Sequence, residues 1–204
     1  MTDRRTIGLL AACLLTCSTP LHAGGPDFTP FLGFQFGGNF EDSATGQRYD
    51  IDSGSAAGAM LSFDLSDISQ LEFYFSRQQT ELQPDGLLAT EPTVDLDIDY
   101  YHVGQTLLMS EGPWQPFVVG SLGATHLSPE SSSARSLTRL SLGLGGGLRY
   151  RPNEHIGLYL AARGFLTFID SQTHITITSG STTVQMNTDG LWQGILQAGL
   201  ILRF

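Results

Sequence analysis

Three residues near the middle of the chain combine a nucleophile with a base and an acid. His126 and Ser128 stand two positions apart, and Glu130 follows. Because residues i and i+2 of a strand share one face, the His126 imidazole could accept the proton of the Ser128 hydroxyl while a carboxylate orients the ring. A serine that precedes a proline, here Pro129, is also common in loops. We therefore expect no enzyme, and keep catalysis by these residues as an alternative.

The acidic run Asp95, Asp97 and Asp99 has the spacing that opens a calcium-binding loop. Such a loop requires a glycine next and a glutamate six residues after it, whereas Tyr100 and Thr106 stand at those positions. Apolar residues alternate with the three aspartates, which is typical of a strand. The run therefore predicts an acidic strand face, and no metal or other cofactor is expected.

The amino terminus has the features of a secretory signal peptide. Two arginines precede an apolar run at residues 7–15, and Leu21-His22-Ala23 ends on a small residue. We expect cleavage after Ala23, so residues 1–23 form the signal peptide and residues 24–204 the mature domain. A lipoprotein attached through Cys13 is the alternative. The run is too short to cross a bilayer as a helix.

Composition then excludes several classes of protein. Cleavage after Ala23 removes both cysteines, so the mature chain cannot be a disulfide scaffold or use a thiol. It leaves 19 acidic and 8 basic residues, a balance that argues against a nucleic-acid partner.

Period-two alternation predicts eight strands and no helix. The predicted strands are residues 28–40, 57–65, 71–78, 94–109, 116–127, 139–150, 156–168 and 191–204. The alternation blurs near His102, where a β-bulge or a change of register is expected. The strand at 116–127 is apolar on both sides, so its outward face is not assigned.

Long and short connections alternate between these strands. The predicted loops are residues 41–54, 83–92, 127–136 and 170–190, and the last contains THITITS, which could form a hairpin. Outer-membrane barrels have short periplasmic turns, long extracellular loops and an even number of strands. The sequence thus predicts an all-β fold, an eight-stranded antiparallel up-and-down transmembrane β-barrel.

Several charged residues fall on the predicted inward face. An eight-stranded barrel is only wide enough for side chains to fill it, so these charges must pair. We expect a polar plug, with an ion-conducting path as the alternative. The expected inward residues are Asp64, Glu72, Asp95, Asp97, Asp99, Arg139, Arg149 and Arg163, with Gln193, Gln197 and Arg203 from the last strand.

The last strand, LWQGILQAGLILRF, ends on Phe204 and has apolar residues at every second position, including Leu196, Leu200 and Leu202. It resembles the carboxyl-terminal assembly signal of bacterial outer-membrane barrels. IDYYHVG, GPWQPFVVGSLGATHLSP and LSLGLGGGLRYRPNEHIGLYLAARGF are similar to the small OmpA-like and porin-family barrels of proteobacteria. The resemblance implies location in the bacterial outer membrane, contact with its lipid and lipopolysaccharide, and handling by the barrel-assembly machinery.

Function is then narrowed to three hypotheses. The first is a non-catalytic barrel with a structural or surface-interaction role, and the second is a narrow passive pore. The third is a lipid A deacylase, because His126 and Ser128 resemble the His-x-Ser of PagL-like enzymes, although Pro129 stands where that family carries asparagine. The sequence identifies no extracellular ligand.

Overall fold

The computed structural model describes residues 25–42, 48–51, 53–84, 94–129, 136–168, 175–179, 182–187 and 190–204. The predicted signal peptide lies outside these residues. In the part of the chain that is described, no helix has the length and apolarity needed to cross a bilayer.

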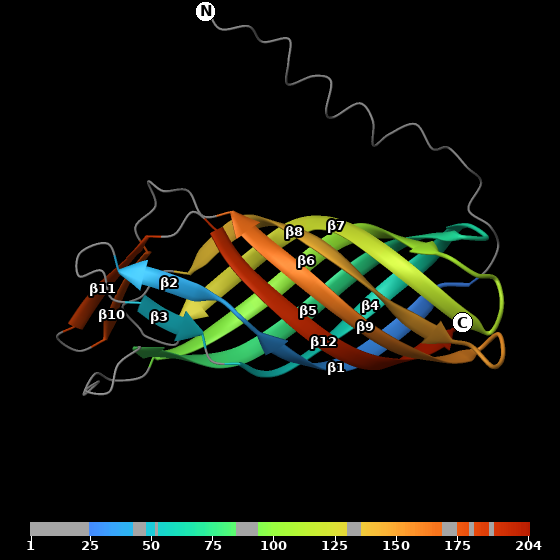
Figure 1. Ribbon diagram of the computed structural model, residues 1–204, viewed down its shortest axis with the longest axis horizontal. Helices are drawn as coiled ribbons and strands as arrows, with labels where there is room; N and C mark the ends of the chain where they lie inside the picture. Colours follow the sequence, from blue (N-terminus) through green and yellow to red (C-terminus); the bar gives the residue numbers. More distant parts are fainter. Residues whose placement is uncertain are drawn as a thin grey trace, which may run out of the picture.

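Eight antiparallel strands form a closed barrel, as predicted (Figure 1). The strands are β1 (Asp27–Phe36), β4 (Gly54–Ser66), β5 (Ser69–Pro84), β6 (Val94–Leu108), β7 (Trp114–Pro129), β8 (Leu137–Tyr150), β9 (Ile156–Phe168) and β12 (Gly190–Arg203). Each pairs with the next along the chain, and β1 pairs with β12 to close the ring. Every barrel strand thus has two partners, as a bilayer requires of its backbone.

The register of the strands fixes the tilt of the barrel. A path of paired residues that leaves β6 at Ile98 and passes once around all eight strands returns to β6 at Leu108. The stagger is therefore ten residues. Eight strands with such a stagger are inclined by roughly 40° to the barrel axis and leave an interior that side chains can fill.

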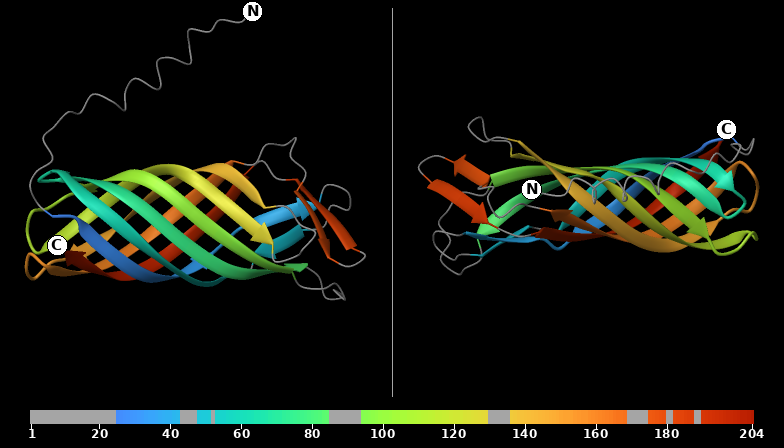
Figure 2. Two further views of the ribbon diagram at one scale, coloured as in Figure 1. Left: turned by 180° about the vertical axis from the view of Figure 1, so that it is seen from behind. Right: turned by 90° about the horizontal axis from the view of Figure 1, so that it is seen from above.

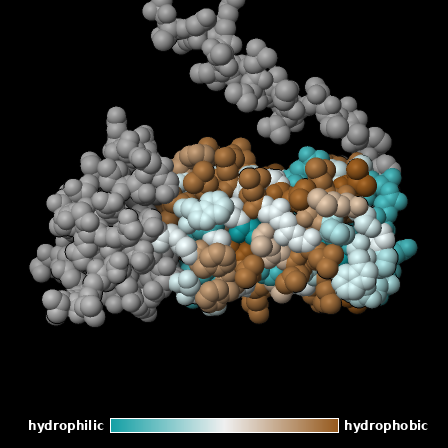
Figure 3. Space-filling view, viewed as in Figure 1, coloured by the Kyte–Doolittle hydropathy of each residue, from teal (hydrophilic) through white to brown (hydrophobic). Residues whose placement is uncertain are grey.

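Side chains alternate between the two faces because lipid and lumen favour different residues. On β1, Leu32 and Phe34 point outward and are exposed, whereas Asp27, Thr29 and Phe31 are buried. The structure also assigns the faces of β7, which the sequence left open: Phe117 and Val119 point inward. Figure 3 shows apolar side chains over the barrel wall and polar ones gathered where the short turns lie.

Four shorter strands extend the sheet beyond one end of the barrel, which we call the loop end. They are β2 (Asn39–Asp42), β3 (Arg48–Ile51), β10 (Ile175–Ser179) and β11 (Thr182–Asn187). They pair in the order β10, β11, β2, β3, and β3 pairs with β5 (Figure 2). The expected hairpin at THITITS is therefore present.

The predicted loop boundaries were wrong at this end. Residues 48–51 fall within the expected loop at 41–54, and β5 and β7 continue to Pro84 and Pro129. The physical reason is that a strand needs an apolar face only where it meets lipid or core, so polar segments can continue the same backbone ladder. The opposite end has short connections and is called the turn end.

The prediction for the upper half of β6 was also wrong. Ile98 and Tyr100 point inward and are fully buried, so Asp97 and Asp99 lie on the outer wall. The register of β6 against both neighbours is continuous, and the expected bulge near His102 is absent. Near the loop end the outward carboxylate of Asp99 is paired with Arg77, while apolar side chains fill the lumen.

Candidate functional site

The barrel interior holds two polar clusters separated from the loop end by packed rings. The central cluster comprises Glu72, Arg163, Tyr159, Tyr74, Gln197 and Thr106. The turn-end cluster comprises Asp27, Asp64, Gln70, Arg149, Arg151 and Arg203. Both are built from residues of many strands, so they form only when the barrel closes.

In the central cluster an ion pair crosses the lumen. Arg163 on β9 forms an ion pair with Glu72, in which Nη1 and Oε1 lie 2.7 Å apart, and it donates a hydrogen bond from Nη2 to Oε2 at 2.9 Å. The strands β5 and β9 lie four places apart in a ring of eight, so the pair joins opposite walls. The two side chains are only 1% and 4% exposed. A charge pair so far from water is retained only where additional hydrogen bonds satisfy it.

Tyr159 and Thr106 form hydrogen bonds with the ion pair, and Gln197 and Tyr74 hold Tyr159 in a wider network. Arg163 Nη2 also donates to Tyr159 Oη at 2.9 Å, and Gln197 Nε2 donates to the same oxygen at 3.0 Å. Tyr74 Oη donates to Gln197 Oε1 at 3.2 Å, and the Arg163 guanidinium lies 4.6 Å from the centre of the Tyr74 ring. Thr106 donates to Glu72. The contacts close a ring around the guanidinium.

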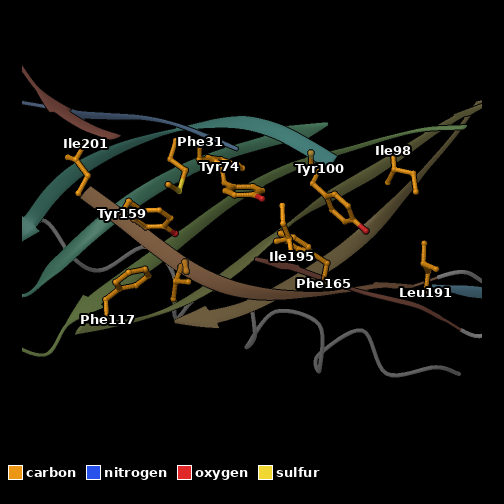
Figure 4. Packing of buried hydrophobic residues seen from close by; sticks show 14 of the residues in the cluster. Phe31, Tyr74, Ile98, Tyr100, Phe117, Tyr159, Phe165, Leu191, Ile195 and Ile201 are labelled. Carbon is orange, nitrogen blue, oxygen red and sulfur yellow. The ribbon is translucent and has the colours of Figure 1, made fainter. Parts of the chain in front are cut away.

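A second bridge crosses the lumen nearer the loop end. Tyr100 Oη on β6 donates to Gln193 Oε1 on β12 at 2.5 Å, again between opposite strands. The Tyr100 ring stacks on Phe165 at 4.3 Å. His102 lies beside them, and both of its ring nitrogens are within hydrogen-bonding distance of serine hydroxyls, those of Ser121 and Ser141. Figure 4 shows Tyr100, Phe165 and Ile195 side by side in the interior.

The turn-end cluster surrounds a single carboxylate. Asp27 has no exposed surface and accepts hydrogen bonds from Arg149 at 2.6 Å, Arg151 at 3.1 Å and Arg203 at 2.6 Å. Arg203 reaches Asp64 as well. Because Asp27 and Arg203 are directly opposite each other on β1 and β12, this cluster holds the strand pair that closes the barrel.

Small residues on β8 make room for this packing. Gly143, Gly145 and Gly147 face inward. A Cβ atom on Gly145 would lie 2.7 Å from the Arg163 Cγ atom and 2.7 Å from the carbonyl oxygen of Ala162. A bulkier residue at position 145 would therefore displace the arginine that bridges the lumen.

The predicted inward residues have different fates. Glu72, Arg149, Arg163, Gln193, Gln197, Asp64 and Arg203 all join the two polar clusters or the second bridge. Arg139 belongs to neither cluster, and its Nη1 donates to the backbone oxygen of Thr138. Asp97 and Asp99 are not in the lumen. Asp95 continues the backbone of β6, where it pairs with Glu81, and its side chain lies outside the described residues.

The sequence analysis missed the partners of these residues. Asp27 precedes the first predicted strand but continues the parity of Thr29 and Phe31, which could have revealed it. Tyr74 lies two positions after Glu72 and so shares its face of β5, but its contacts with β12 cannot be read from the sequence. Nothing local distinguishes Tyr159, because its hydroxyl acts only through contacts with β9 and β12.

His126 and Ser128 both point outward from β7, near the loop end. Asp99 lies directly opposite His126, and Asp97 opposite Ser128. The His126 ring, however, bonds through Nδ1 to Thr138 Oγ1 at 2.8 Å, and both oxygens of Asp99 accept hydrogen bonds from Arg77. Glu130 lies outside the described residues. Among the residues described, no group of three or more His, Asp or Glu side chains could hold a metal ion.

The last strand points its apolar row outward. Leu196, Leu200 and Phe204 are exposed, and Leu202 is partly so. This placement agrees with a lipid-facing surface. Recognition of these residues by the assembly machinery stays a prediction.

Comparisons with known proteins agree with this architecture. A family model described as outer membrane protein beta-barrel domain matches residues 9–204. Neisserial surface protein A has a similar structure, with a TM-score of 0.61 at 15% identity, over 88% of this chain and 97% of the other. The outer membrane protein OprG from Pseudomonas aeruginosa has a TM-score of 0.59 at 17% identity, over 90% of this chain and 97% of the other. The outer membrane protein AlkL has a TM-score of 0.61 at 16% identity, over 89% of this chain and 90% of the other. No curated protein matches.

Proposed function

The chain belongs to the family of outer membrane protein β-barrel domains, and from this premise we propose that it is a structural or surface-interaction barrel of the bacterial outer membrane, with a lumen closed to solutes and no catalytic activity. One observation carries the proposal. Two bridges between opposite walls, Glu72–Arg163 and Tyr100–Gln193, cross the lumen at different heights. A conducting pore of eight strands would need that space for water.

Conductance in a planar bilayer tests the closed lumen. The purified mature chain is expected to give no conductance steps. A variant that removes both bridges, Glu72→Ala with Arg163→Ala and Tyr100→Ala with Gln193→Ala, is the positive control, because it takes out both side-chain pairs that cross the lumen. A Gly120→Ala variant on the outer wall is the negative control. Stepwise conductance of the wild type would overturn the proposal in favour of a narrow passive pore.

The geometry around His126 supports the absence of catalysis. A serine hydrolase needs its histidine bonded to the nucleophile and to an orienting carboxylate. Here Thr138 occupies Nδ1, and Asp99 is engaged by Arg77. Expression of the wild type should leave the mass of lipid A unchanged. A mass change that Ser128→Ala abolishes would contradict this and favour the deacylase.

The extension at the loop end supports a surface role. The four short strands carry the sheet beyond the barrel, and within the described part of the chain β10 pairs on one side only. An unpaired strand edge is suited to binding an extended segment of another protein. We propose that contacts of this kind, together with contacts to lipopolysaccharide, are what the molecule contributes at the cell surface.

A further inference from the structure

The outer wall contains an apolar groove that the packing of the strands leaves open. It has a volume of about 370 Å³. Its outward lining residues include Phe28, Ala59, Leu61, Phe73, Phe75 and Tyr101, which come from β1, β4, β5 and β6. Ala59 is small and pairs with Phe75 on one side and Pro30 on the other. The groove therefore follows from one short side chain between larger ones.

An ion pair lies next to the lining of this groove, on the side of the loop end. Phe75 pairs with Tyr101, and the next outward pair on the same two strands is Arg77 with Asp99. Arg77 donates from Nε and Nη2 to the two oxygens of Asp99, at 2.6 and 2.7 Å. The Arg77 side chain is 51% exposed, whereas that of Asp99 is 5% exposed. The Nη1 atom of Arg77 has no partner among the described residues, so this atom can donate a hydrogen bond to a group outside the barrel.

The polar residues mark where the hydrocarbon ends on this side. Arg77, Asp99, His126 and Thr138 form one continuous row of outward pairs across four strands. The next row toward the turn end is Phe75, Tyr101, Ala124 and Leu140. Charged side chains on a lipid-facing barrel wall are tolerated near the interface and costly in the hydrocarbon. The groove thus lies in the hydrocarbon with a guanidinium at its interfacial end.

We propose that the groove binds one phosphorylated, acylated lipid of the outer leaflet, the class to which lipid A belongs. One acyl chain lies along Ala59 between the aromatic side chains, and a phosphate oxygen accepts a hydrogen bond from Arg77. The charged end is at the loop end, which selects the outer leaflet. The proposal deepens and rests on the proposed function, because it requires the barrel to span the membrane with its loops outside.

Native mass spectrometry of the refolded mature chain tests the site. The probes are diphosphorylated lipid A and the same lipid after removal of its phosphates. The wild type should retain one lipid A, and the dephosphorylated probe should bind about tenfold more weakly, the effect of one charge-assisted hydrogen bond. Arg77→Gln should lose the difference between the probes. Ala59→Leu fills the groove and should weaken both probes, whereas Ala162→Leu, the matched change on β9, should leave binding unchanged.

Asp99→Asn gives a result of opposite sign. Removing the carboxylate frees the Arg77 guanidinium for the phosphate, so lipid A should bind more tightly than to the wild type. Equal binding of both probes to the wild type, or unchanged binding to Arg77→Gln and Ala59→Leu, would overturn the proposal. The folded band on a semi-denaturing gel confirms that each variant forms the barrel. If the barrel neither conducts nor binds lipid A, the lipid site is overturned and the closed lumen stands. If the barrel conducts and binds lipid A, the closed lumen is overturned and the lipid site stands.

Discussion

Arg163 and Glu72 show how much one buried residue can depend on another. The pair is almost free of solvent, and Tyr159 and Thr106 form hydrogen bonds with the same two atoms that join its partners, Arg163 Nη2 and Glu72 Oε2. The energetic meaning of such a pair lies in what happens when one partner is absent, because the remaining charge stays buried.

Arg163→Met should therefore destabilise the barrel by about 3–5 kcal/mol, since the Glu72 carboxylate loses its partner. Urea unfolding in lipid vesicles, followed by tryptophan fluorescence, measures the change. Replacing both residues, Arg163→Met with Glu72→Leu, should restore most of the stability. If the double variant were as unstable as the sum of the single changes, the two residues would not act as a pair.

The acidic residues of β6 explain why residue-scale prediction succeeded only in part. Glu72, Arg149 and Arg163 were predicted inward because apolar residues alternate with them where strands meet lipid. The same rule failed for Asp97 and Asp99, because near the loop end the outer wall meets water or headgroups, and the polar face can be the outer one. An alternation pattern separates the two faces of a strand, but it does not say which face points into the lumen.

At the scale of one strand, the inward face of β8 contains glycines at three alternate positions, 143, 145 and 147. Its inward glycines leave space that side chains of the next strand fill. Gly145→Ala should destabilise the barrel by about 1–3 kcal/mol, because the added Cβ atom meets both a carbonyl oxygen and the Arg163 side chain.

The matched control for this change is Gly120→Ala. Gly120 points outward from β7, and its added Cβ atom would meet only the Leu144 Cδ2 atom, at 3.7 Å. Unfolding in urea should be unchanged for this variant. Equal losses at both positions would show that strand propensity, and not lumen packing, decides the outcome.

The eight barrel strands and their order could be predicted from the sequence. Each of them has a row of apolar, lipid-facing side chains that is long enough to give a clear period-two pattern. The row Trp192, Leu196 and Leu200 on β12 is an example. The short strands β2, β3, β10 and β11 have no such row, and their pairing depends on segments far apart in the chain. For the same reason the ring around Arg163 could not be predicted, since β5, β9 and β12 meet only after closure.

For the whole molecule, the turn-end cluster is where closure is secured. Asp27→Asn removes the carboxylate shared by Arg149, Arg151 and Arg203, so the barrel should unfold at a clearly lower temperature on a semi-denaturing gel. Asp64→Asn is the control, because Asp64 is partly exposed and, among the residues that the structure describes, forms an ion pair with Arg203 alone. A larger decrease in unfolding temperature for Asp64→Asn would show that Asp27 does not hold the β1–β12 strand pair together.

The ten-residue stagger has a consequence for engineering this chain as a display scaffold. One extra residue in any barrel strand would turn every later side chain of that strand to the other face, placing Arg163 or Glu72 in lipid if β9 or β5 were changed. Two extra residues would keep the faces but alter the stagger and with it the width of the lumen. Peptides for display therefore belong at the loop end between β5 and β6 or between β7 and β8, outside the strands that set the stagger and outside the short strands β2, β3, β10 and β11.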